Sequence, residues 1–101
     1  MDHQITSLPD AVRVTLRGRL TFAENGGVRT LLDSLAALPA GRPVVFDLAG
    51  VEFIDSAGLG LLLHARATLA ARAAPLSLCN ATGQVGRMLD LARIGDLFAG
   101  A

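Results

Sequence analysis

Several residue types are missing or rare in this sequence, and each shortage narrows what the chain can be. It contains no Trp, no Tyr and no Lys, with only four Phe and one Cys among 101 residues. Leu, Val and Ala must therefore fill the core, and a hydrophobic content of 51% is enough for one domain. We expect a single domain over residues 1–101.

Charge is low and balanced. Charged residues make up 18% of the chain, with nine basic and nine acidic residues and a formal net charge of zero. The basic residues are all arginines and are scattered from Arg13 to Arg93. Proteins that bind nucleic acid usually concentrate basic residues in one patch. The sequence therefore predicts no nucleic-acid partner.

The only cysteine, Cys79, excludes an internal disulfide and lies in an apolar stretch, where a free Cys usually packs as a small hydrophobe. Together with His3 and His64 it shows no spacing typical of metal ligands. We expect neither a metal nor a cofactor.

The sequence also lacks the segments that direct a chain to or across a membrane. Its first residues do not form a basic region followed by an apolar stretch, so we expect no signal peptide. The longest apolar run, residues 59–63, is far too short to cross a bilayer. A cytoplasmic protein without direct membrane insertion is the expectation.

The hydrophobic period changes along the first half of the chain. Residues 11–18 alternate apolar and polar side chains, which predicts a half-buried strand. Residues 28–38 place their leucines on one helical face, and Pro39 and Gly41 stand where this helix should stop.

Further along, predicted strands and helices alternate, at residues 43–54, 56–73, 75–79 and 82–95. The first of these strands is expected to turn at residues 49–50 before it continues to residue 54. Such alternation predicts an α/β fold, a mixed or parallel sheet with helices packed on it.

The most informative segment is residues 53–63, FIDSAGLGLLL. Asp55 is a good N-cap, because its carboxylate can accept a backbone N–H of the first helical turn. Ser56 follows where the strand ends and the helix begins, near the rim of the sheet, so solvent should reach its hydroxyl. A phosphate there would add about −1.5 to −2 charges. The helix N-terminus would favour that charge, and Asp55 would oppose it.

Helical spacing separates the residues of this helix into faces. One set is expected to face the sheet: Gly58, Leu62, Ala65, Leu69 and Ala73. The opposite set is expected in water: His64, Thr68 and Arg72. Between Ser56 and the wet side lie Ala57, Gly60 and Leu61. Small side chains and an exposed Leu61 beside a modifiable serine predict a docking patch. Gly58 can equally serve close packing on the sheet, and Gly60 less so, because glycine within a helix costs about 1 kcal/mol relative to Ala.

Residues 44–60, VVFDLAGVEFIDSAGLG, resemble the signature of the sulfate transporter and anti-sigma factor antagonist (STAS) domain. The likeness extends to residues 12–20, 87–91 and 97–98, and is to the bacterial anti-sigma factor antagonists in particular. It implies a mixed sheet of four to five strands with helices mainly on one face.

The resemblance also implies a partner switch. In that family the unmodified protein binds an anti-sigma factor that is also a serine kinase, and so releases the sigma factor. The kinase phosphorylates the serine that Ser56 matches, after an acid that Asp55 matches, and a metal-dependent serine phosphatase reverses this. The expected partner-binding residues are Thr21, Asp55, Ser56, Ala57, Gly58, Gly60, Leu61 and His64.

Two departures from the family stand out. Thr21 occupies a position where relatives usually have Asp, which puts partner choice or affinity in question. Relatives also continue beyond the position of Leu97 and Phe98 into a last strand and helix. We therefore expect a short final strand here and no last helix.

Enzymatic alternatives fit poorly. A serine hydrolase needs a base beside the hydroxyl, and His64 is eight residues along the same helix, about 12 Å away. A nucleophile elbow would need Gly in place of Ile54, and a dinucleotide fingerprint would need Gly in place of Leu63. No catalytic residue is expected.

Two uses of the same fold remain open. One is a scaffold subunit of a signalling assembly, and the other is the cytoplasmic subunit of a membrane transport complex. Neither needs phosphorylation, and Ser56 would then serve only as a helix-start residue.

Overall fold

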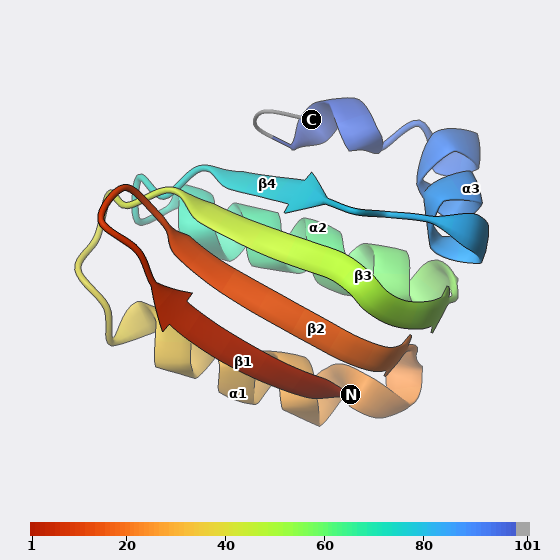
Figure 1. Ribbon diagram of the computed structural model, residues 1–101, viewed down its shortest axis with the longest axis horizontal. Coiled ribbons are helices and arrows are strands. Elements are labelled where there is room, and N and C mark those ends of the chain that lie inside the picture. Colours follow the sequence, from red (N-terminus) through yellow and green to blue (C-terminus); the bar gives the residue numbers. More distant parts are fainter. Residues whose placement is uncertain (99–101) are drawn as a thin grey trace.

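The computed structural model describes residues 1–98, which form a four-stranded sheet with two helices across one face (Figure 1). The strands follow one another in the order β1 (Asp2–Ser7), β2 (Val12–Leu20), β3 (Val44–Ile54) and β4 (Leu76–Cys79). β1 is antiparallel to β2, whereas β2, β3 and β4 run parallel. The predicted α/β fold with a mixed sheet is confirmed.

Helices α1 (Asn25–Ala36) and α2 (Ser56–Ala70) cover the same face, and α3 (Gly83–Ala92) lies at the end of the sheet (Figure 1). Two 3-10 turns complete the described chain, η1 (Phe22–Glu24) and η2 (Gly95–Leu97). No helix among residues 1–98 combines the length and apolar character that crossing a membrane requires.

The core lies between the sheet and these two helices and is almost wholly aliphatic. On β2 the alternation places Val12, Val14 and Leu16 inside, as predicted. From α1 the leucines at one helical face pack inward, and from β3 Phe46 adds the largest fully buried side chain. Leu and Val side chains thus fill most of the core of this chain, which has few aromatic residues.

Strand β1 was not predicted. Its sequence, DHQITS, offers the core only two half-buried side chains, His3 and Ile5, so no apolar pattern distinguishes it. Its pairing with β2, from Asp2 opposite Arg17 to Ser7 opposite Val12, defines it as a strand.

The turn predicted at residues 49–50 is wrong, because β3 runs unbroken through them. The pairing of β2 with β3 shifts in register between Thr15 and Arg17, opposite this point. A Cβ on Gly50 would lie 2.9 Å from the Leu16 carbonyl oxygen, so the two backbones approach closely here. Ala49 and Gly50 therefore form an irregularity within a strand.

Two helix ends also differ from the prediction. Helix α2 ends at Ala70, and Ala73, expected to face the sheet, is exposed with a left-handed backbone, while Ala74 is buried in its place. Helix α3 ends at Ala92 because Arg93 takes the left-handed conformation, φ 55°. Gly95 begins η2 and does not end α3.

At the chain's end a short final strand was predicted. The described residues there form η2, followed by Phe98, which is extended and buried. Residues 99–101 lie outside the described residues.

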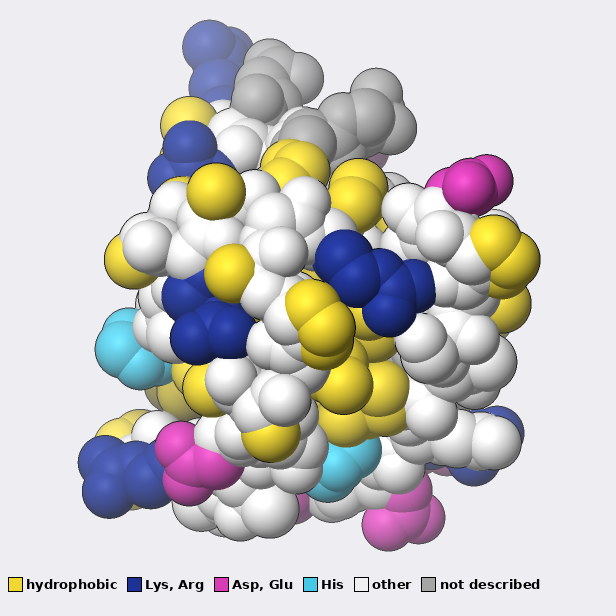
Figure 2. Space-filling view, turned by 90° about the vertical axis from the view of Figure 1, so that its left-hand side faces the viewer, with side chains coloured by type: hydrophobic (Ala, Val, Ile, Leu, Met, Phe, Trp, Pro, Cys, Tyr) yellow, Lys and Arg dark blue, Asp and Glu magenta, His cyan; other side chains and the backbone are white. Residues whose placement is uncertain are grey.

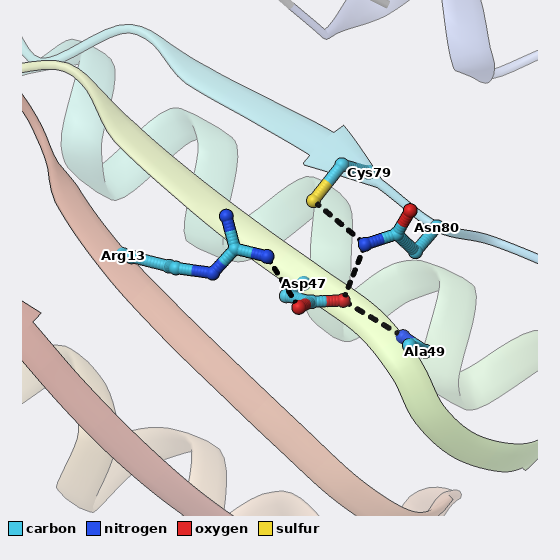
Figure 3. A network of polar contacts seen from close by, with 5 residues as sticks. All are labelled: Arg13, Asp47, Ala49, Cys79 and Asn80. Atoms are coloured by element: carbon cyan, nitrogen blue, oxygen red, sulfur yellow. Dashed lines mark hydrogen bonds and ion pairs between the residues drawn. The ribbon is translucent and has the colours of Figure 1, made fainter.

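The face of the sheet opposite α1 and α2 carries a polar network centred on Asp47 (Figure 3). Its Oδ2 pairs with Arg13 Nη2 at 2.5 Å, and its Oδ1 accepts from the Ala49 N–H and from Asn80 Nδ2, both at 3.0 Å. Asn80 Nδ2 also lies 3.7 Å from Cys79 Sγ. The Ala49 and Asn80 hydrogen bonds, with a smaller contribution from Arg13, lower the pKa of Asp47 below its ordinary value.

The loss of stability caused by replacing Asp47 should depend on pH, and its direction follows from the lowered pKa. Because the pKa of Asp47 is lowered in the folded state, its charge contributes stability at pH values above the pKa that Asp47 has in the unfolded chain. That contribution is lost as pH falls through the folded-state pKa. Asp47→Asn should therefore lower the free energy of unfolding by about 1–2 kcal/mol near pH 7.

Urea unfolding of both proteins near pH 7 and about pH 3 measures this, and the difference should shrink at the lower pH. Asp33→Asn, at an exposed position of α1, is the matched control. A difference that grows as pH falls would contradict the role assigned to Asp47.

Candidate functional site

The side chain of Asp55 caps the start of α2, as the sequence predicted. Asp55 has an extended backbone, and its Oδ1 accepts the Gly58 N–H at 2.7 Å. This bond satisfies one of the N–H groups that a helix leaves free in its first turn. The predicted N-cap is confirmed.

Ser56 is the first residue of α2 and is exposed. It follows the carboxyl end of β3, the end of a parallel sheet where α/β proteins commonly place their sites. Among residues 1–98, no hydrogen bond involves its hydroxyl group. The hydroxyl is therefore accessible to a modifying enzyme or to a binding partner.

Gly58 holds this helix against the sheet. A Cβ there would lie 2.0 Å from the Leu20 carbonyl oxygen and 2.7 Å from Ile54 Cγ1, far inside contact distance. Gly58 is buried, so it lies beneath the surface that Ser56 occupies. Any effect of Gly58 on a partner would come through the position of α2.

The end of β2 lies against the same helix start. The Asp55 N–H points to the Leu20 carbonyl oxygen at an N–O distance of 3.4 Å, so Thr21 follows directly beside the cap. Thr21 is half-buried and precedes η1. The structure thus brings Thr21 close to Asp55 and Ser56, which are far from it in sequence.

The next residue, Phe22, was not singled out from the sequence. Its side chain is 73% exposed, which is unusual for one of only four aromatic residues in the chain. Exposure of this kind depends on tertiary packing, because the sequence around Phe22 does not show which side chains remain uncovered. Phe22 adds an apolar group next to Thr21.

Further along α2, the predicted docking residues line its outer side. Gly60 and His64 are exposed, and Ala57 and Leu61 are half-buried. A Cβ on Gly60 would meet no atom within 4 Å, so nothing in the fold requires glycine there. We call Thr21, Phe22, Ser56, Ala57, Gly60, Leu61 and His64 the Ser56 surface.

A groove of about 170 Å³ between α1 and α2 continues this surface. Leu61, His64 and Thr68 line it from α2, and Val28 and Arg29 are among those that line it from α1. Thr68 was expected in water and is half-buried in this groove.

Arg72 was also expected in water, and it too is half-buried, with Nη2 donating to the Leu38 carbonyl oxygen at 2.8 Å. The sheet-facing set is confirmed apart from Ala73: Gly58, Leu62, Ala65 and Leu69 are all buried.

A glutamine that sequence reasoning missed anchors the strand end before the site. Gln84 Oε1 accepts the Ile54 N–H at 2.9 Å, and Gln84 Nε2 donates to the Ile54 carbonyl oxygen at 2.7 Å. Pairing with β4 reaches only as far as Asp47 opposite Cys79, so this end of β3 has no neighbouring strand on that side. The Gln84 side-chain amide makes the two backbone hydrogen bonds that a neighbouring strand would make. It thereby holds Ile54, the residue before Asp55, in position.

The described residues include no cluster of three His, Cys, Asp or Glu side chains that could hold a metal ion. The arrangement at Ser56 offers an exposed hydroxyl, a capped helix start and a partly apolar surface. Such an arrangement can present a hydroxyl group and apolar side chains to another molecule.

Comparison with known proteins gives consistent results. The family model described as "Mlab, STAS domain" matches residues 3–99. A STAS-domain containing protein of Pseudomonas aeruginosa is 31% identical over 98 residues, which cover 93% of this chain and 95% of that protein.

Three solved structures share the fold. An anti-sigma factor antagonist from Mycobacterium paratuberculosis has a TM-score of 0.82 at 17% identity, over 97% of this chain and 82% of that one. The anti-sigma factor antagonist SpoIIAA in its unphosphorylated form has a TM-score of 0.66 at 21% identity, over 93% and 84%. The murine anion transporter Slc26a9 has a TM-score of 0.76 at 18% identity, over 93% of this chain and 16% of that one.

The two glycines of α2 should respond oppositely to alanine. Gly58→Ala should lower the free energy of unfolding by about 1–3 kcal/mol, because the new methyl group collides with the Leu20 carbonyl. Gly60→Ala has open space and should raise it by about 0.5–1 kcal/mol through helix propensity. Urea unfolding of the pair measures both, and equal stabilities would show that α2 does not approach β2 as described.

Proposed function

This chain belongs to the STAS domain family, and from that membership we propose that it acts as an anti-sigma factor antagonist controlled at Ser56. In this proposal the unphosphorylated protein binds an anti-sigma factor that is also a serine kinase, in the cytoplasm. Phosphorylation of Ser56 abolishes the binding, and a metal-dependent serine phosphatase restores it. The chain itself catalyses nothing.

The observation that supports this most is the placement of Ser56. Its side chain is exposed on a surface of small and apolar groups, and the backbone around it is held by the Asp55 cap and the Gln84 clamp. A rigid surface loses little conformational entropy when it docks. A partner that fits this surface closely would have to desolvate any charge placed on it.

The local structure around Ser56 tolerates a phosphate. Free N–H groups and the positive end of the helix dipole favour the added charge, and the Asp55 carboxylate repels it. These effects are of similar size and opposite sign. The fold should therefore persist in both forms, while about −1.5 to −2 charges appear on the Ser56 surface.

A second function has specific support. The matching family model is described as "Mlab, STAS domain", and the same fold occurs within the murine anion transporter. In that alternative the chain is a subunit of a transport complex and docks through the same surface without phosphorylation. Ser56 would then matter only as a helix-start residue.

The behaviour of Ser56 variants distinguishes the two functions. Wild type should gain one phosphate from its kinase and ATP, and Ser56→Ala should gain none while it still binds the kinase. Ser56→Asp should bind more weakly, because it places a charge where a neutral surface docks. A loss of about 1.4 kcal/mol corresponds to a tenfold lower affinity.

Calorimetric titration of the three proteins with the candidate kinase measures these affinities, and mass spectrometry counts the phosphate. Circular dichroism should show the same fold for all three. Equal affinities together with no phosphate on wild type would support the transport subunit instead.

Phe22 should act as an apolar anchor for the partner at the Ser56 surface. An aromatic side chain that forms a hot spot of an interface contributes about 2 kcal/mol or more, so Phe22→Ala should weaken partner binding by roughly thirtyfold. Stability should hardly change, because the side chain is 73% exposed. Leu91→Ala is the matched control, since Leu91 is 80% exposed but lies near the end of α3, outside the Ser56 surface. Equal weakening by both variants would remove Phe22 from the interface.

A further inference from the structure

The end of the molecule opposite Ser56 carries an apolar surface of its own. All four prolines of the sequence lie there and are exposed, in the three loops that precede the parallel strands: Pro9, Pro39, Pro43 and Pro75. Leu8, in the β1–β2 turn, is 41% exposed. Figure 2 views this end and shows hydrophobic side chains gathered at its centre, between two groups of basic side chains.

Backbone hydrogen bonds show that these loops are neighbours. The Val12 N–H donates to the Pro43 carbonyl oxygen at 2.8 Å, and the Val44 N–H donates to the Pro75 carbonyl oxygen at 2.9 Å. The apolar groups therefore lie side by side at the amino ends of β2, β3 and β4. We call Leu8, Pro9, Pro39, Pro43 and Pro75, with Arg42 and Arg72, the proline surface.

Two arginines tie these loops together. Arg42 Nη1 donates to Ser7 Oγ at 2.9 Å, and its Nη2 donates to the carbonyl oxygens of Leu8 and Ala11. Arg72 holds the loop after α1, through its bond to the Leu38 carbonyl. In return the Arg72 carbonyl accepts the Gly41 N–H at 3.0 Å.

The charges of these arginines are not neutralised within the described chain. Among the side chains that the structure describes, the ion pairs join the Met1 amino group to Glu24 and Arg13 to Asp47. Asp10 belongs to the same turn as Leu8, yet no ion pair joins it to Arg42 or Arg72. Carbonyl and hydroxyl oxygens orient a guanidinium group but carry no net charge, so both arginines keep a positive charge beside the proline-containing loops.

These features favour an acidic protein segment as the occupant. Exposed contiguous apolar surface on a small domain commonly marks an interface, and proline-containing loops are ordered before binding. Guanidinium groups pair best with carboxylates. A second copy related by a twofold axis would bring the same surface, whose named residues include no carboxylate to pair with the arginines. Two arginines attract an anionic membrane by only about 2 kcal/mol.

We propose that the proline surface is a second docking site, which binds a segment of another protein that carries an apolar side chain flanked by carboxylates. It lies at the other end of the sheet from the Ser56 surface. A partner held here would keep its place while the Ser56 surface binds or releases another protein. The proposal does not depend on phosphorylation, and it applies equally to a subunit of a transport complex.

Selection of phage-displayed peptides on the immobilised full chain tests it. Enriched peptides should carry Asp or Glu on both sides of an apolar residue, and their binding should weaken as salt concentration rises. A synthetic peptide from this set should bind Leu8→Glu and Pro39→Glu at least about tenfold more weakly than wild type. Phe22→Glu, which alters the Ser56 surface, should bind it like wild type.

Several results would overturn the proposal: no enrichment, peptides without carboxylates, or equal binding to wild type and to both variants when circular dichroism shows them folded. Light scattering and vesicle sedimentation address the other occupants. A dimer of wild type that Leu8→Glu abolishes would assign the surface to a second copy. Binding to phosphatidylglycerol vesicles that the same variant abolishes would assign it to a membrane.

Discussion

The contact between Gly58 and the Leu20 carbonyl oxygen is the constraint on which the site depends. A helix and a strand end meet there with no room for a methyl group. Because the contact lies in the first turn of α2, it sets where the helix begins relative to the sheet. It also brings the chain after Leu20 beside Asp55, which creates one surface from two segments that are remote in sequence.

The direction of the strands explains why the molecule has two different ends. Three parallel strands place the starts of η1, α2 and the segment leading to α3 at their carboxyl ends, where helix starts and exposed hydroxyl groups collect. Their amino ends receive the loops that return from α1 and α2, and the antiparallel β1 adds its turn to the same end. Prolines suit such loops because they limit the conformations of the chain before each strand. The proposed modification site and the proposed second docking site thus lie at opposite ends of the sheet.

Much of this fold and site could be predicted from the sequence, because local patterns decide it. The period of α2 correctly placed Leu62, Ala65 and Leu69 on the sheet, and the Asp55 cap follows from residue type and position. The predictions that failed concern features that depend on contacts between residues far apart in the sequence. Polar β1 is a strand only because β2 pairs with it.

Residues 49–50 look like a turn in isolation, yet the register shift opposite Arg17 absorbs them into β3. The roles of Gln84 and Phe22 were equally hidden. The first depends on β4 ending early, and the second on what the fold leaves uncovered. Local sequence patterns therefore predicted that Ser56 lies at a helix start, whereas tertiary contacts decide which residues surround it.

A rigid site also determines how a modification can act. The start of α2 is fixed by a side-chain cap, by close backbone packing and by the Gln84 clamp, and none of these contacts uses the Ser56 hydroxyl. A charge added to that hydroxyl would therefore not be absorbed by a local rearrangement of the helix start. It would remain at the surface, where a close-fitting partner must either desolvate it or supply a cation. Because the fold does not depend on this hydroxyl, phosphorylation would act on an interface at this surface and would leave the free energy of unfolding nearly unchanged.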